Sequence, residues 1–82
     1  MENYLFGDKV TFKCKFRDGF KILKNGAIIM SSPANEKKIT YDIYLNGVQY
    51  VKIPVEWILE KTGVYTAEEM YRFLRTQWEE EK

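Results

Sequence analysis

Histidine is absent from this 82-residue chain, and cysteine occurs only once, at Cys14. Without histidine the chain lacks the side chain that most often serves as general base or metal ligand near neutral pH. A lone cysteine cannot form an intrachain disulfide, on which small secreted domains usually depend, so we expect a cytoplasmic protein. The five glycines are scattered and form no phosphate-binding loop. These absences predict a protein that is not an enzyme and that holds no metal and no cofactor.

No apolar run approaches the ~20 residues that a membrane-spanning helix needs. Residues 1–4 lack a charged segment followed by an apolar run, so no signal peptide is expected. The net charge is only +1 and the pI is about 7.8, whereas dedicated nucleic-acid-binding domains usually exceed ~9. The charge is unevenly spread, because residues 1–55 have a basic surplus and residues 56–82 an acidic one. We expect no membrane association and no small-molecule substrate.

The chain is instead rich in short alternating segments and in aromatic residues, which make up 16% of it. Between residues 10 and 17 apolar and basic residues alternate, which predicts a strand with a basic outer face. Its inward residues are Val10, Phe12, Cys14 and Phe16. On that face Cys14 is interpreted as a small buried hydrophobic residue.

Two dipeptides, Asp18-Gly19 and Asn25-Gly26, are typical of tight turns. The segment between them is too short to assign. Residues 27–30 are apolar and predict a mostly buried strand. Residues 31–37 are predicted to form a loop, because Pro33 cannot donate to a strand ladder and its neighbours favour turns.

A β-hairpin is predicted around a third turn signal, Asn46-Gly47. Two registers are compatible with it. A two-residue turn pairs Leu45 with Val48, whereas a three-residue loop with a bulge pairs Tyr44 with Val48. We prefer the bulged register, because it gathers one apolar set on a single face. That set is Ile39, Tyr41, Ile43, Val51 and Ile53.

The last third of the chain predicts a helix. Pro54 ends the preceding strand, residues 55–59 predict a short helical turn, and residues 62–65 a last short strand. Thr66 and Glu69 form a capping box, so the helix is expected from residue 67 to about residue 80. Its predicted buried stripe is Ala67, Met70, Tyr71, Leu74 and Trp78, with Phe73 outside it.

The Gly-Asp-x-Val start at Gly7, the segment 41–47 and the Pro54-x-Glu56-Trp57 run resemble SH3-like small β-barrels, in which a 3-10 turn follows the penultimate strand. The resemblance covers about residues 6–65. It implies a mostly β (α+β) fold: a five-stranded barrel or bent antiparallel sheet with one C-terminal helix. We expect one domain over residues 1–82, with the barrel at 6–65 and the helix at 66–81. In length and lack of catalytic signature the chain is also similar to small accessory proteins of phages and mobile elements.

The expected function is non-catalytic binding of a protein, either a host partner or a second copy of this chain. In the bulged register the outer face of the hairpin carries two tyrosines and a valine, which is typical of the centre of an interface. The candidate partner-binding residues are Tyr44, Val48, Tyr50, Asp42 and Phe73. The competing interpretation is that the C-terminal helix covers the two tyrosines.

Two other functions stay open. The first is nucleic-acid binding by the basic strand face and the segment after it, through Lys13, Lys15, Arg17, Lys21 and Lys24, with Phe20 as a stacking ring. The second is a structural role as an assembly subunit. The alternative interpretation of the basic face, without a binding role, is a solvated strand surface whose lysines protect a sheet edge from pairing with another chain.

Overall fold

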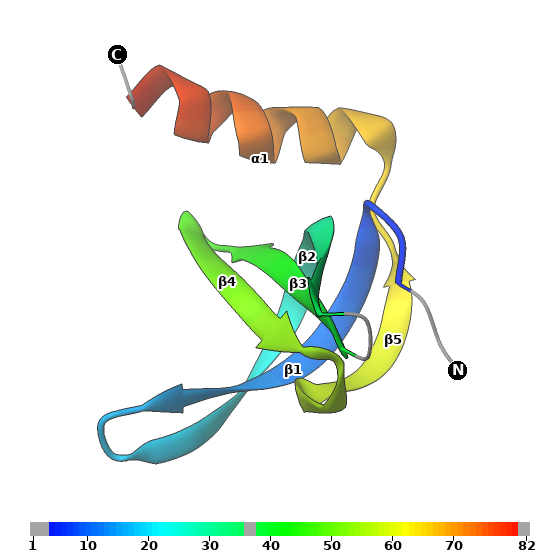
Figure 1. The fold of residues 1–82 in the computed structure, drawn as a ribbon. Helices are drawn as coiled ribbons and strands as arrows, with labels where there is room; N and C mark the ends of the chain where they lie inside the picture. The colour runs from blue at the N-terminus through cyan, green and yellow to red at the C-terminus, as the bar shows by residue number, and fades with distance from the viewer. Residues whose placement is uncertain (1–3, 36–37, 81–82) are drawn as a thin grey trace.

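Five antiparallel strands form one sheet, and an α-helix follows them (Figure 1). The computed structural model describes residues 4–35 and 38–80. The elements are β1 (Asp8–Phe16), β2 (Gly19–Asn35), β3 (Lys38–Leu45), β4 (Val48–Pro54), the 3-10 helix η1 (Val55–Trp57), β5 (Ile58–Val64) and α1 (Ala67–Glu80). The strands lie in the order β4-β3-β2-β1-β5. The expected mostly β fold with a C-terminal helix is confirmed.

The long strand β2 bends the sheet around its core. Its first half pairs with β1 and its second half with β3, and both pairings include Ala27. The two partners therefore occupy opposite edges of β2 and overlap only near its middle. A stagger of this kind lets a twisted sheet curl toward a barrel, and Figure 1 shows β1 and β2 running on as a hairpin that projects from the rest of the molecule.

The prediction of a turn at Asn25-Gly26 is wrong, because β2 continues through both residues. Asn25 has φ 68°, and here Lys24 and Asn25 face a single residue of β1, which makes a β-bulge. Gly26 is needed for a different reason. A Cβ at Gly26 would lie 2.6 Å from Ile43 Cγ2 and 2.7 Å from Phe12 Cε1, so only glycine lets the strand approach the core this closely.

The predicted loop at residues 31–37 is also wrong over residues 31–35, which belong to β2 and pair with β3. Pro33 is opposite Ile39 in this ladder. By this point β2 has passed the end of its pairing with β1, and no other strand of residues 4–35 and 38–80 pairs with that edge, so it tolerates a proline. Residues 36 and 37 lie outside the described part of the chain.

The β3–β4 hairpin adopts the two-residue register, so the preferred bulged loop is wrong. Leu45 pairs with Val48 across Asn46 (φ 50°) and Gly47 (φ 84°), the conformation that an Asn-Gly turn favours. The extra residue is inserted further along β4, at a bulge where Lys52 has φ 56°. The bulge returns the end of β4 to the core face.

The β4 bulge decides which of the five expected interior residues are buried. Tyr41, Ile43 and Ile53 are buried, and Ile53 pairs with Tyr41 instead of Ile39. Val51 lies in the bulge and is 56% exposed, so its expected place in the core is wrong. Ile39 is 37% exposed, because the pairing with β4 ends one residue earlier, at Thr40.

The main core lies on the concave side of the sheet and contains the expected β1 residues Val10 and Phe12, both fully buried. Cys14 is half-buried against this cluster. Thr11, expected on the outer face, is buried, because β5 flanks it on one side and the β2 bulge on the other. Tyr4 packs edge-on against Tyr41 at 5.5 Å and completes the cluster.

The turn expected after Pro54 is present as η1, and Ile58 just after it is buried in the main core while Trp57 packs against that core. The strand that follows is longer than expected, because β5 begins at Ile58 and pairs with β1 along most of its length. The order β4-η1-β5 therefore returns the chain to the far edge of the sheet.

Helix α1 has the expected bounds, and its capping box is confirmed. The Glu69 N–H donates to Thr66 Oγ1 (3.1 Å), and the Thr66 N–H donates to Glu69 Oε1 (2.9 Å). The pKa of Glu69 lies below its ordinary value, chiefly because the Thr66 N–H bonds its carboxylate and next because of the Thr66 side chain. No helix within the described ranges is long and apolar enough to cross a membrane.

The helix docks on the sheet through a second cluster of Ala27, Tyr44 and Met70. Phe73, expected outside the buried stripe, stacks on Tyr44 and belongs to this contact, whereas Tyr71 is 59% exposed. Met70 and Phe73 are three residues apart and share one helix face. Phe73 therefore takes the place that was expected for Tyr71 on the buried face of the helix. The side chain of Trp78 lies outside the described part.

Candidate functional site

The five candidate partner-binding residues do not form one surface. Tyr44 is 9% exposed and lies beneath α1, where its ring stacks on Phe73 at 5.1 Å and 21°. Tyr50 is opposite Ile43 and packs edge-on against Phe12 at 5.5 Å, so it faces the main core. The two-residue register places these tyrosines on opposite faces of the sheet, and the helix covers only Tyr44.

The other two candidates lie apart from both tyrosines. Asp42 accepts hydrogen bonds from the Lys52 N–H (3.2 Å) and from Gln49 Nε2 (3.3 Å), so its carboxylate satisfies an amide that the β4 bulge releases. Val48 is 49% exposed at the start of β4. A role of these residues in partner binding stays a prediction, but the single aromatic patch that motivated it is absent.

A more coherent surface lies on one face of the projecting β1–β2 hairpin. Lys13 is opposite Ile22 and Lys15 is opposite Phe20, so these four side chains point to the same side. Phe20 is 51% exposed and Ile22 is 64% exposed. We call this set the hairpin face.

Phe20 is the centre of the hairpin face. Lys13 Nζ lies 5.0 Å from the centroid of the Phe20 ring, and the half-buried Trp57 ring meets it edge-on at 5.1 Å. A cation over a ring at an exposed site is worth about 0.5–1 kcal/mol. Both contacts position the ring while about half of its side chain remains open to solvent.

The remaining basic candidates surround this face without sharing it. Lys21 is opposite Cys14 on the other side of the hairpin, with its Nζ 5.3 Å from the Phe16 ring centroid. Its ion pair with Asp18 is 3.9 Å long and exposed, so it contributes little. Arg17 lies in the exposed turn at the tip. Lys24 lies at the β2 bulge, where it also borders a second surface.

The hairpin concentrates positive charge. Residues 13–24 contain five basic residues and one acidic residue, whereas the rest of the chain has eight basic and eleven acidic ones. The near-neutral net charge of the chain is therefore the sum of a strongly basic hairpin and an acidic remaining part. The hairpin projects from the rest of the molecule (Figure 1). Its positive electrostatic potential therefore extends away from the acidic part and attracts a negatively charged ligand to the hairpin.

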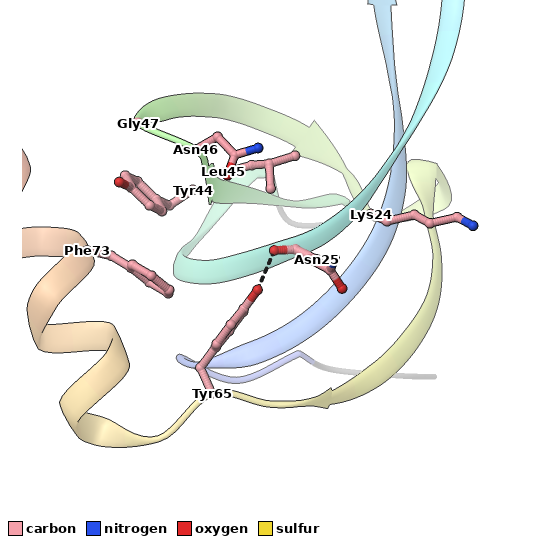
Figure 2. A pocket seen from close by; sticks show the side chains of 8 residues that line it. All are labelled: Lys24, Asn25, Tyr44, Leu45, Asn46, Gly47, Tyr65 and Phe73. Carbon is pink, nitrogen blue, oxygen red and sulfur yellow. Dashed lines mark hydrogen bonds between the residues drawn. The ribbon is translucent and has the colours of Figure 1, made fainter.

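A groove of about 260 Å³ lies between α1, the β3–β4 turn and the β2 bulge (Figure 2). Its lining residues are Lys24, Asn25, Tyr44, Leu45, Asn46, Gly47, Tyr65 and Phe73. The Tyr65 hydroxyl donates to the backbone oxygen of Asn25 at 2.6 Å, which ties the segment before the helix to the bulge. Tyr65 also meets Phe73 edge-on at 5.1 Å.

Burial raises the pKa of Tyr65, and the nearby Glu69 carboxylate raises it further. The hydroxyl therefore keeps its proton, and its bond to the bulge, across the neutral range. Lys9 Nζ lies 4.6 Å from the Tyr65 ring centroid, on a ring that is already fixed at two other points. Tyr65 thus forms a rigid wall of the groove.

Sequence reasoning missed this groove, although its signals were present. Asn25 and Asn46 each precede a glycine and were interpreted only as turn residues. Both have positive φ, and both line the groove from two distant points of the chain. Both residues are exposed, so their side-chain amides are open to solvent at the groove.

Among residues 4–35 and 38–80 no three His, Cys, Asp or Glu residues gather to hold a metal ion. Comparisons with protein-family models, with curated proteins and with solved structures find no match to this chain.

Proposed function

We propose that this protein is a non-catalytic binding module whose hairpin face takes single-stranded nucleic acid. The arrangement of Phe20, half exposed and flanked by Lys13 and Lys15, is the observation that carries the proposal. Single strands are bound by basic groups that follow the phosphates and by rings on which bases stack. The hairpin supplies both on one projecting element.

The fold agrees with such a role. The strand order β4-β3-β2-β1-β5, with a 3-10 turn between β4 and β5, supports the resemblance to SH3-like small barrels. The five-stranded sheet holds the base of the hairpin, so the positions of Phe20, Lys13 and Lys15 along the strands are set before a ligand binds. Binding of a protein partner is the alternative function. The single aromatic patch on β3 and β4 that favoured it is absent, because Tyr44 and Tyr50 lie on opposite faces of the sheet.

The test compares binding of a labelled single-stranded oligonucleotide of about 12 nucleotides, by fluorescence anisotropy over a salt series. For a single strand, the logarithm of affinity falls by about 0.7 per phosphate contact for each decade of salt. The variant Lys13→Gln/Lys15→Gln should therefore reduce the slope by about 1.4 if each lysine contacts one phosphate. Lys52→Gln is the matched control, because Lys52 is an exposed lysine outside the hairpin.

The ring is tested separately. Phe20→Ala should weaken binding about tenfold without changing the salt slope, because stacking of a base on a ring contributes about 1–3 kcal/mol. Phe20→Leu retains an apolar side chain against Trp57 but removes the ring, and it should show a similar loss. Equal affinity of wild type and all hairpin variants would refute the proposal. Binding of an acidic protein but of no oligonucleotide would favour a protein partner instead.

A further inference from the structure

We infer that the groove between α1, the β3–β4 turn and the β2 bulge is a pocket for one nucleobase of the strand that the hairpin face holds. This inference rests on the proposed function and extends it from affinity to base preference. The observation behind it is the combination of three rings with two exposed asparagine side chains around one small cavity.

The walls of the groove are suited to a flat ring. Tyr44, Tyr65 and Phe73 provide aromatic surface, and their mutual contacts hold each ring in place without help from a ligand. The volume of about 260 Å³ falls just below the range of pockets for drug-sized molecules, about 300–1,000 Å³. A single planar base is therefore a better fit than a larger cofactor.

The polar groups of the groove are suited to a base edge. Asn25 and Asn46 come from the bulge and the turn on two sides of the cavity, as Figure 2 shows. Each primary amide offers two donors and an acceptor, which match the paired donor and acceptor of a base edge. Unstacked bases of single strands are recognised in this way, by rings on their faces and hydrogen bonds on their edges.

The groove is continuous with the proposed strand site. Lys24 belongs to the basic hairpin and also lines the groove. From Phe20 to Asn25 the chain advances five residues along β2, or about 16 Å at the rise of a strand. A strand that stacks on Phe20 and runs along β2 toward Lys24 therefore reaches the groove without crossing the acidic part of the molecule.

The test uses Asn25→Gly/Asn46→Gly, which removes both amides but keeps residues that tolerate positive φ and adds no charge. Affinities are measured for oligo-dA, oligo-dC and oligo-dT of about 12 nucleotides. Wild type should prefer one base, and the variant should lose about tenfold of that preference, because a bidentate base contact is worth about 1–3 kcal/mol. Its salt slope should match that of wild type, whereas Lys13→Gln/Lys15→Gln should change the slope and keep the preference.

A second measurement addresses the groove without the hairpin. Free nucleoside monophosphates are titrated into the protein while backbone amide resonances are followed by NMR. Shifts centred on Asn25, Asn46 and Tyr65, absent in the double glycine variant, would support a base site in the groove; if no oligonucleotide binds, the proposed function fails while this base site stands. Equal affinity for all three oligonucleotides refutes the base pocket and leaves the proposed function standing. Absence of nucleotide-induced shifts at the groove also refutes it.

Discussion

Replacing Gly26 by alanine tests whether β2 is held against the core as closely as its geometry indicates. The added Cβ would lie 2.6 Å from Ile43 Cγ2 and 2.7 Å from Phe12 Cε1. Both neighbours are fully buried, so neither can move aside into solvent. The substitution therefore overpacks the centre of the main core and should displace the strand or both side chains.

The expected cost is large for a chain of this size. Overpacking of a well-filled core costs about 1–3 kcal/mol, and two rigid neighbours place Gly26→Ala near the upper limit. The whole stability of 82 residues is about 4–12 kcal/mol. A loss of about 3 kcal/mol should lower the melting temperature by about 12–24 °C, at about 4–8 °C per kcal/mol.

Urea unfolding followed by circular dichroism measures this cost, with Gly47→Ala as the matched control. A Cβ at Gly47 meets nothing within 4 Å, but φ is 84°, so that variant should lose about 1 kcal/mol through backbone strain alone. Adding Ile43→Leu removes the Cγ2 methyl and should recover part of the Gly26→Ala loss as a favourable coupling in a double-mutant cycle. A Gly26→Ala cost below about 0.5 kcal/mol, or no coupling with Ile43, would refute the close-packing argument.

Three further outcomes are expected. Tyr65→Phe should lower the free energy of unfolding by about 1 kcal/mol at neutral pH through the lost hydrogen bond. Because the folded-state pKa of Tyr65 lies above 10.0, the stability difference between wild type and variant should shrink as the pH rises beyond that value. A stability difference that stays constant in alkaline urea titrations would contradict this. Thr66→Ala should cost about 1 kcal/mol in urea unfolding, because the Glu69 N–H loses its acceptor, Thr66 Oγ1. The bond from the Thr66 N–H to the Glu69 carboxylate survives in this variant. Because the pKa of Glu69 is lowered, the stability from that bond is present above the ordinary value of 4.5 and is lost as the pH falls through the lowered one, so equal acid sensitivity of wild type and Glu69→Gln would count against it. Ile53→Ala should lower the free energy of unfolding by about 2–5 kcal/mol and Val51→Ala by less than about 1 kcal/mol, since Ile53 is buried and Val51 is exposed. Equal losses of stability in thermal unfolding would show that the β4 bulge is misplaced.

Elements whose causes are local were predicted well. The alternation in β1, the position of the turn at Asn46-Gly47 (though not its preferred register) and the capping box of α1 each depend on residues within a few positions of one another. The hydroxyl of Thr66 needs only the amide three residues on, and the start of the helix at Ala67 followed from it. Such signals are complete in the sequence, because no distant segment takes part in them.

Features that depend on distant neighbours were missed. Asn25-Gly26 has the same two residues as Asn46-Gly47, yet one dipeptide continues a strand and the other turns the chain. The difference is that Gly26 lies between Phe12 and Ile43, which no pattern local to the dipeptide records. The bulge in β4 has the same character, because burial of Ile53 against Tyr41 selects it over an expanded turn.

The candidate site shows the same division. The sequence alone indicated a mostly β fold, the absence of histidine, the basic run that ends at Lys24 and Phe20 as a ring for stacking. Tertiary structure decided that Phe20 and two lysines share one face, that α1 hides Tyr44, and that two Asn-Gly dipeptides border one groove. Composition and period are properties of short segments, whereas shared faces and cavities arise only when strands pair in a particular register and a helix docks at a particular rotation.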